Sequence, residues 1–226
     1  MLSKTFLLTG LLLLPAWSLA MMDDDPTVSM IRFNEFEVRD NESSALDGDF
    51  WIGRDLRKFW VKGEVERHDG DIESSELQFL FSRAIAPNWD VQVGIRQEFD
   101  PSPDRTWFAF GVQGLAPYYF ESDMTLFVGE SGRTALRLSF EKELMLTQRW
   151  VLSPEIEVGL FGKDDAARGV GRGLSSAEVG VRLRYEFRRE IAPYIGVHRE
   201  RSFGRTADFS GDDSRTTFVV GLRWWH

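Results

Sequence analysis

Hydrophobic and polar side chains alternate along most of the chain after residue 27. In the segment LSSAEVGVRLRYEF, Val179, Val181 and Leu183 share one face of an extended strand, and Arg182 and Arg184 share the other. Successive side chains of a strand point to opposite sides, so a repeat of two residues is typical of a β-strand and not of a helix. The segments ALRLSFEKELML and VLSPEIEVGL repeat the pattern.

This alternation predicts about twelve strands. They are expected at residues 28–39, 46–53, 56–67, 72–85, 89–99, 105–116, 118–129, 133–146, 149–162, 174–188, 191–203 and 214–226. Connections after the odd-numbered runs are polar and rich in Gly and Asp, whereas the others are short and flanked by aromatic residues. Short turns at one rim, longer loops at the other and an even strand count are typical of outer-membrane barrels. The sequence therefore predicts an all-β fold, a closed antiparallel up-and-down transmembrane β-barrel of about 12 strands.

The last segment, FVVGLRWWH, is an aromatic-rich strand whose free edge would favour aggregation. Pairing with the first strand would close the barrel and leave no edge, with the apolar face toward lipid. Aromatic residues gather toward the tight turns, as in an interfacial girdle. The expected girdle consists of Trp89, Tyr118, Tyr119, Trp150, Tyr194, Trp224 and Trp225.

Residues that alternate with the lipid face must line the lumen. This predicted row is rich in charged and amide side chains: Lys58, Lys62, Glu64, Glu66, Glu76, Gln78, Gln92, Arg96, Glu98, Gln113, Glu121, Asp123, Arg137, Glu141, Glu143, Glu155, Glu157, Glu178, Arg182, Arg184, Glu186, His198, Glu200 and Arg223. A twelve-stranded barrel is intermediate in diameter between eight-stranded barrels, whose interior is filled by side chains, and sixteen-stranded barrels, which leave an aqueous channel. Both a salt-bridged, closed interior and a conducting lumen fit the row. We expect Glu121, Asp123, Glu141, Glu143, Glu155 and Glu157 to attract cations.

The N-terminal segment predicts export. Lys4 precedes an apolar run at residues 6–14, and Ser18-Leu19-Ala20 offers a cleavage site, as in a secretory signal. The run is short for a transmembrane helix, although a membrane anchor is the alternative interpretation. The expected organisation is a signal peptide at 1–20, a short N-terminal segment at 21–27 and an outer-membrane barrel at 28–226.

Composition narrows the function classes. The chain has no cysteine and a net charge of -9, which argues against disulfides and against nucleic acid as a partner. A mean hydropathy of -0.27 excludes a multi-helix membrane protein but fits a barrel whose strands are half apolar. The sequence lacks a G-x-S-x-G motif, and His68, His198 and His226 lie in separate segments. We therefore predict no enzyme, with an active site at the outer-membrane rim as the alternative.

Candidate metal ligands are few. Thioether sulfur favours Cu(I), and Met21, Met22 and Met30 lie in the segment MMDDDPTVSM. His198 falls in the predicted lumen row. Met21, Met22, Met30 and His198 are therefore candidate ligands, although methionine is more often an apolar filler.

Several stretches also resemble one protein family. They include FWIGRDLRKFWVKGE, SRAIAPNWDVQVGIRQEF, GVQGLAPYYFE, LFVGESGRTALRL, LTQRWVLSPEIE and GKDDAARGVGRGLSSAEVGVRLRYEFRREIAPYIGV. In these stretches, over nearly all of residues 28–225, the chain resembles the outer-membrane copper resistance protein B family of Gram-negative bacteria. The resemblance implies a barrel that passes or handles copper ions, either transported or transiently bound. The implied partners are outer-membrane lipid and lipopolysaccharide, copper ions and a periplasmic multicopper oxidase.

Two features depart from the family pattern. Family members typically carry a Met- and His-rich segment ahead of the barrel, whereas MMDDDPTVSM contains no His. The resemblance therefore implies that the short segment at 21–27 is a remnant of that Met-rich region. Many barrels end on Phe, whereas this sequence ends on Trp225-His226. The barrel itself is therefore the expected functional part, and a closed structural barrel that docks a periplasmic copper-detoxifying partner is the alternative.

Overall fold

The computed structural model describes residues 25–40, 42–211 and 214–226. Short helical turns lie at η1 (Pro117–Tyr119), η2 (Glu130–Gly132) and η3 (Ala166–Arg168), and a short helix at α1 (Arg205–Ser210). The strands are β1 (Val28–Arg39), β2 (Ser43–Arg54), β3 (Arg57–His68), β4 (Asp71–Ala86), β5 (Trp89–Asp100), β6 (Arg105–Ala116), β7 (Phe120–Gly129), β8 (Thr134–Lys142), β9 (Leu144–Met145), β10 (Trp150–Phe161), β11 (Gly173–Tyr185), β12 (Ile191–Ser202) and β13 (Ser214–Trp225). The expected signal peptide lies outside these ranges.

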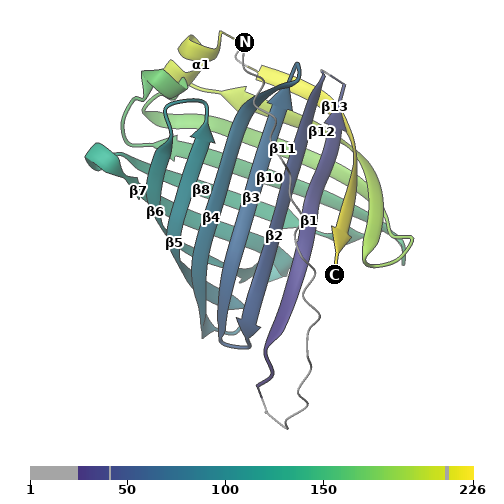
Figure 1. Ribbon diagram of the computed structural model, residues 1–226. Coiled ribbons are helices and arrows are strands. Elements are labelled where there is room, and N and C mark those ends of the chain that lie inside the picture. Colours follow the sequence, from purple (N-terminus) through teal and green to yellow (C-terminus); the bar gives the residue numbers. More distant parts are fainter. Residues whose placement is uncertain (1–24, 41, 212–213) are drawn as a thin grey trace, which may run out of the picture.

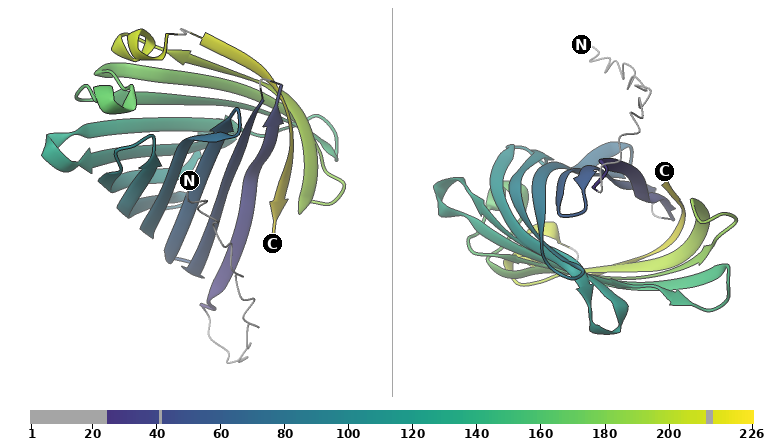
Figure 2. Two further views of the ribbon diagram at one scale, coloured as in Figure 1. Left: turned by 45° about the horizontal axis from the view of Figure 1, so that its top comes forward. Right: turned by 90° about the horizontal axis from the view of Figure 1, so that it is seen from below.

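The strands form one closed antiparallel barrel (Figures 1 and 2). β8 and β9 together form the strand predicted at 133–146, interrupted at Glu143, and both pair with β10. Counted as one, they give the twelve-stranded barrel that the alternation predicts. β13 pairs with β1, where Val38 lies opposite Val220. Ile31 and His226 exchange two backbone hydrogen bonds of 2.9 Å, so the last strand leaves no free edge, as predicted.

The apolar face of the strands points outward. Large apolar side chains are exposed all around the barrel, and Phe108, for example, is 72% exposed. An apolar belt of this extent would be unfavourable in water and is typical of a lipid-facing surface. Among the described residues, no helix has the length and apolarity needed to cross a bilayer.

A β-bulge in β1 turns two consecutive residues into the lumen. The register against β2 shifts between Phe33 and Glu35. Asn34 donates a hydrogen bond of 2.8 Å to the Asp47 carboxylate, and Glu35 forms an ion pair of 2.6 Å with Arg182. Because a bulge places two residues opposite one, strict alternation fails here and the lumen gains charged residues that the predicted row lacks.

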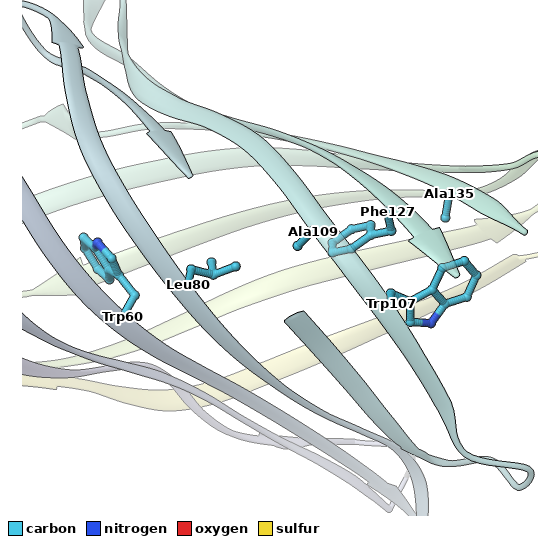
Figure 3. Close-up of a cluster of buried hydrophobic side chains, with 6 residues drawn as sticks. All are labelled: Trp60, Leu80, Trp107, Ala109, Phe127 and Ala135. Carbon is cyan, nitrogen blue, oxygen red and sulfur yellow. The ribbon is translucent and has the colours of Figure 1, made fainter. Parts of the chain in front are cut away.

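One wall of the lumen is apolar. Its side chains come from β3, β4, β6, β7 and β8 and are drawn in Figure 3: Trp60, Leu80, Trp107, Ala109, Phe127 and Ala135. They occupy inward positions, where the predicted row named only polar residues. The guanidinium of Arg96 lies 4.6 Å from the centre of the Phe127 ring and that of Arg137 lies 5.9 Å from it. The apolar wall therefore supports charged side chains that reach into the lumen.

The predicted aromatic girdle contains one error. Tyr118 and Tyr119 are 79% and 76% exposed at the tight-turn rim, and Trp150 is also exposed. Tyr194, in contrast, is 4% exposed, and its hydroxyl donates a 3.0 Å hydrogen bond to Glu37. Tyr194 lies four residues before His198 on β12 and shares its lumen face, so it is an interior residue.

Candidate functional site

A cavity of about 760 Å³ runs through the barrel interior. It is lined by twelve carboxylates, Glu35, Asp47, Asp49, Glu64, Glu66, Glu76, Glu121, Asp123, Glu141, Glu155, Glu157 and Glu178. Seven lysines and arginines oppose them: Arg32, Arg39, Lys62, Arg96, Arg137, Arg182 and Arg223. Acidic side chains therefore outnumber basic ones in the lining of this cavity.

Strand register lines up many of these carboxylates. Glu35, Asp47, Glu64, Glu76 and Glu98 are successive cross-strand partners from β1 to β5. Like charges directly opposite each other destabilise a sheet unless counter-charges intervene. Sequence reasoning missed Glu35 and Asp47. The break in apolar spacing in IRFNEFEV, where a two-residue step becomes three between two phenylalanines, could have revealed the bulge that places Glu35 in this row.

Two further carboxylate rows lie on the opposite half of the barrel. Glu157 and Glu178 are cross-strand partners on β10 and β11, and Glu178 lies opposite Glu200 on β12. On β7, β8 and β10 the partners are Glu121, Glu141 and Glu155. Four of the six predicted cation-attracting carboxylates, Glu121, Glu141, Glu155 and Glu157, therefore belong to larger acidic rows.

Arg137 supplies the counter-charge at the centre of the lumen. From β8 it donates two 3.0 Å hydrogen bonds to Glu76 on β4. Its Nε lies 3.2 Å from Glu157, and its Nη1 lies 3.8 Å from Glu64. Arg96 contacts Glu76 at 2.5 Å. Because β4 and β8 are four strands apart, this ion-pair cluster crosses the lumen.

Lys62 makes a second crossing toward the tight-turn side. Its ammonium on β3 lies 2.9 Å from Asp123 on β7 and also donates to Gln92 and Gln113, at 3.4 and 3.3 Å. Gln92 in turn donates to Gln113 at 2.8 Å. The two crossings tie opposite walls together and narrow the cavity.

Arg182 connects three strands beside the barrel closure. Its guanidinium lies 2.6 Å from both Glu35 and Glu37 on β1 and also contacts Glu155 on β10. The Glu37 side chain is fully buried and also accepts the Tyr194 hydroxyl. A buried carboxylate requires this degree of pairing, because its desolvation is costly.

The predicted cation-attracting carboxylates differ in their pairing. Asp123, Glu155 and Glu157 are paired as described above. Glu143 binds Arg184 at 2.6 Å and Arg223 at 2.8 Å. Within the described ranges, neither a hydrogen bond nor an ion pair engages the carboxylates of Glu121 and Glu141. Among the described residues, these two are therefore the members of the set in which both carboxylate oxygens lack a partner, and both line the cavity.

The candidate metal ligands do not converge. Met21 and Met22 lie outside the described residues. Met30 shares the lumen face of Arg32 near the start of β1, whereas His198 lies beside Arg39 at the loop end. Nine residues of strand between Met30 and Arg39 correspond to about 30 Å. Across the described part of the chain, no three His, Asp or Glu side chains are grouped closely enough to hold a metal ion.

Arginines join the loops at the other rim. Asp165, in the loop after β10, accepts hydrogen bonds of 2.9 and 3.2 Å from Arg105 and pairs with Arg133 at 3.2 Å. Arg168 donates to the carbonyls of Pro101 and Pro103, at 2.6 and 3.0 Å. These contacts hold the loop at 162–172 against the loop at 101–104.

Acidification is expected to release the loop at 162–172. Hydrogen bonds from Arg105 lower the pKa of Asp165. The stabilisation that the ionised Asp165 carboxylate gives the folded loop is therefore complete above the pKa of an unfolded Asp, about 4. It is lost as the pH falls through the lower pKa of Asp165 in the folded state. Hydrogen exchange in this loop, corrected for intrinsic rates, should accelerate below about pH 4. In Asp165→Asn, hydrogen exchange in the loop should be fast at every pH. In Asp208→Asn, which changes an exposed residue of α1, exchange should follow the wild-type pH dependence. A pH-independent wild-type loop would contradict the prediction.

Comparison with known proteins identifies the family. The family model described as copper resistance protein B precursor (CopB) matches residues 27–226. Copper resistance protein B of Escherichia coli is 48% identical over 196 residues, which are 84% of this chain and 66% of that protein. The copper resistance protein B homolog of Pseudomonas syringae pv. tomato (strain ATCC BAA-871 / DC3000) is 43% identical over 191 residues, 82% of this chain and 65% of that protein. The chain thus spans about two thirds of the length of these curated relatives.

The fold is similar to that of solved porins. The NanC porin gives a TM-score of 0.57 at 13% identity, covering 87% of this chain and 99% of that one. The KdgM porin gives 0.51 at 14% identity, covering 87% and 98%. These likenesses concern the fold alone, and neither they nor the matched family indicate an enzymatic class. The chain belongs to the copper resistance protein B family, and its barrel is an outer-membrane barrel.

Proposed function

We propose that the barrel passes copper ions across the outer membrane through its acidic lumen. The observation that carries this proposal is the excess of twelve carboxylates over seven basic side chains along a single cavity. Walls of low dielectric strengthen the field of such charges and concentrate cations inside. The copper is the cargo of the barrel, in keeping with the family to which the chain belongs.

A cation that passes through the lumen must compete with Lys62 and Arg137 for the carboxylates with which they pair. Glu121 and Glu141 lie opposite each other on β7 and β8, toward the tight-turn rim, and offer unpaired oxygens to an ion. Deeper in the cavity, Lys62 pairs with Asp123, and Arg137 pairs with Glu76 and Glu157. A passing ion would therefore be bound briefly and displaced, which suits conduction better than storage.

Neutralising the free pair is expected to reduce copper flux. The double variant Glu121→Gln/Glu141→Gln keeps the shape of both side chains, and Cu²⁺ uptake into proteoliposomes should fall to about a third or less. Copper tolerance of a deletion strain complemented with this variant should fall in parallel. Glu190→Gln, in an exposed turn, is the matched control. Unchanged flux and tolerance in the double variant would overturn the lumen pathway.

The crossings favour a second candidate, a closed barrel that docks a periplasmic copper-detoxifying partner such as a multicopper oxidase. Lys62–Asp123 and Arg137–Glu76 both span the lumen, as a plug would. Planar-bilayer recordings separate the two candidates. The conducting barrel gives a cation-selective current, whereas the closed barrel gives none.

A further inference from the structure

The loop at 162–172 forms a roof over one half of the barrel mouth at the loop end. It follows β10, yet Arg168 lies 3.3 Å from Glu98 on β5, and Asp165 pairs with Arg105 on β6. Because β10 and β5 are four strands apart, the loop crosses the mouth between them. The side chains of Arg168 and Glu98 are only 9% and 8% exposed, so the roof is closely packed.

The short helix α1 lies on the same half of the mouth. Arg205 at its start pairs with Asp164 in the roof. The hydroxyl of Thr206 accepts a 2.9 Å hydrogen bond from the backbone amide of Gly171. These contacts hold α1 against the roof (Figure 1).

The other half of the mouth contains a cavity of about 210 Å³, here called the vestibule. Its lining comes from β1, β2, β3, β4, β12 and β13. The charged part of that lining consists of three arginines and three glutamates, Arg39, Arg67, Arg215, Glu66, Glu73 and Glu200. Arg39, Glu66 and Ser74 also line the large lumen cavity, so the two cavities adjoin.

An ion pair stands where the vestibule meets the lumen cavity. Arg39 lies 3.1 Å from Glu66, and their side chains are 12% and 32% exposed. Ser74 donates a 3.4 Å hydrogen bond to Glu66. A second pair in the vestibule, Arg215 and Glu73, has a distance of 4.0 Å and is more exposed still. Exposed ion pairs are weak, so the contacts in this half of the mouth yield to a solute more readily than those of the roof.

We propose that the lumen opens to the loop side through the vestibule, past the Arg39–Glu66 pair, and not beneath the loop at 162–172. This inference rests on the proposed passage of copper and assigns the passage its opening at the loop end. Arginines balance glutamates in the vestibule, whereas carboxylates outnumber basic side chains in the lumen cavity. Arg39 therefore supplies an electrostatic barrier at the opening, between the loop side and the acidic lumen.

Single cysteines can locate the opening, because the chain has no cysteine of its own. The protein is reconstituted in lipid vesicles with its loops outward, an orientation that protease cleavage of the loops checks. A cationic, membrane-impermeant methanethiosulfonate reagent is then added outside. Ser74→Cys, in the vestibule, should react at least about tenfold faster than Ser139→Cys, which lines the lumen cavity on β8.

The barrier is tested by changing Arg39 in the Ser139→Cys protein. Arg39→Met should speed the reaction of this cysteine several-fold, because a positive charge no longer stands at the opening. Arg39→Lys keeps the charge and should react at nearly the original rate. The matched control is Lys163→Met, which removes an exposed positive charge from the roofed half and should leave the rate unchanged. No acceleration by Arg39→Met, or equal acceleration by Lys163→Met, would overturn the proposed opening.

A second measurement leaves Arg39 intact. The reagent attached to Ser74→Cys should reduce the cation current through planar bilayers, whereas the same label on Ser131→Cys, exposed on the roofed half, should not. An unchanged current after labelling of Ser74→Cys would also overturn the opening. Heat-modifiable electrophoretic migration checks that each variant is folded.

Copper uptake by vesicles that contain the cysteine-free protein separates this inference from the passage itself. Labelling of Ser139→Cys that depends on Arg39, without any copper uptake, overturns the passage alone. Copper uptake together with labelling of Ser139→Cys that is insensitive to Arg39→Met overturns the proposed opening alone.

Discussion

Replacing Arg182 with methionine is expected to lower the free energy of unfolding by about 3–5 kcal/mol, the range for breaking a buried ion pair. Among the residues that the structure describes, Arg182 alone joins Glu35 and Glu37 on β1 to Glu155 on β10. Without it, the partners that the fully buried Glu37 keeps in the described ranges are the Tyr194 hydroxyl and Arg39, at the longer distance of 3.4 Å. The closure between the first and last strands should therefore open first. Urea unfolding in lipid vesicles, followed by heat-modifiable migration, measures the change.

The matched control is Arg199→Met, an exposed, outward-facing position on β12, where the change should stay within about 0.5 kcal/mol. A double variant, Arg182→Met/Glu37→Gln, should recover part of the lost stability, because it removes the orphaned charge as well. Equal losses in Arg182→Met and Arg199→Met would show that the ion pairs beside the closure do not stabilise the barrel.

The strands and their outward face could be predicted because each depends on local alternation. Runs such as EVGVRLRY carry the two-residue repeat without interruption, and the structure pairs them as expected. The same rule failed at Asn34 and Glu35, where a bulge shifts the phase by one residue. It also gave no indication of the apolar wall around Phe127, because a lumen position can be filled by packing as well as by charge.

The candidate site was predictable in composition but not in arrangement. The inward register placed Glu121, Glu141 and His198 in the lumen from alternation alone. Which carboxylate meets which arginine depends on the stagger of the whole barrel, which no single segment encodes. Arg137, for example, reaches Glu76 across four strands. Likewise, Met30 and His198 were grouped by ligand chemistry, although they occupy opposite ends of the barrel wall.

Replacing Arg137 with methionine is expected to raise the cation conductance of the reconstituted barrel several-fold. The guanidinium sits among Glu64, Glu76 and Glu157 and both obstructs and neutralises the middle of the lumen. Methionine keeps much of the side-chain volume but removes the positive charge, so cations meet a more negative path. Arg96 remains to pair with Glu76, which limits the loss of stability. Single-channel current in planar bilayers and the reversal potential in a salt gradient measure conductance and selectivity.

Salt distinguishes an electrostatic effect of Arg137→Met from a change of shape. If the removed charge is responsible, the gain in cation selectivity should shrink as ionic strength rises toward about 1 M, where charges are screened within about 3 Å. Arg83→Met removes a charge from an exposed, outward-facing position on β4 and should leave the current unchanged. A folded Arg137→Met barrel with wild-type current would mean that ions do not pass the Arg137 cluster. In that case the ion-pair crossings act as a permanent plug, and the closed, docking barrel becomes the better account of this family member.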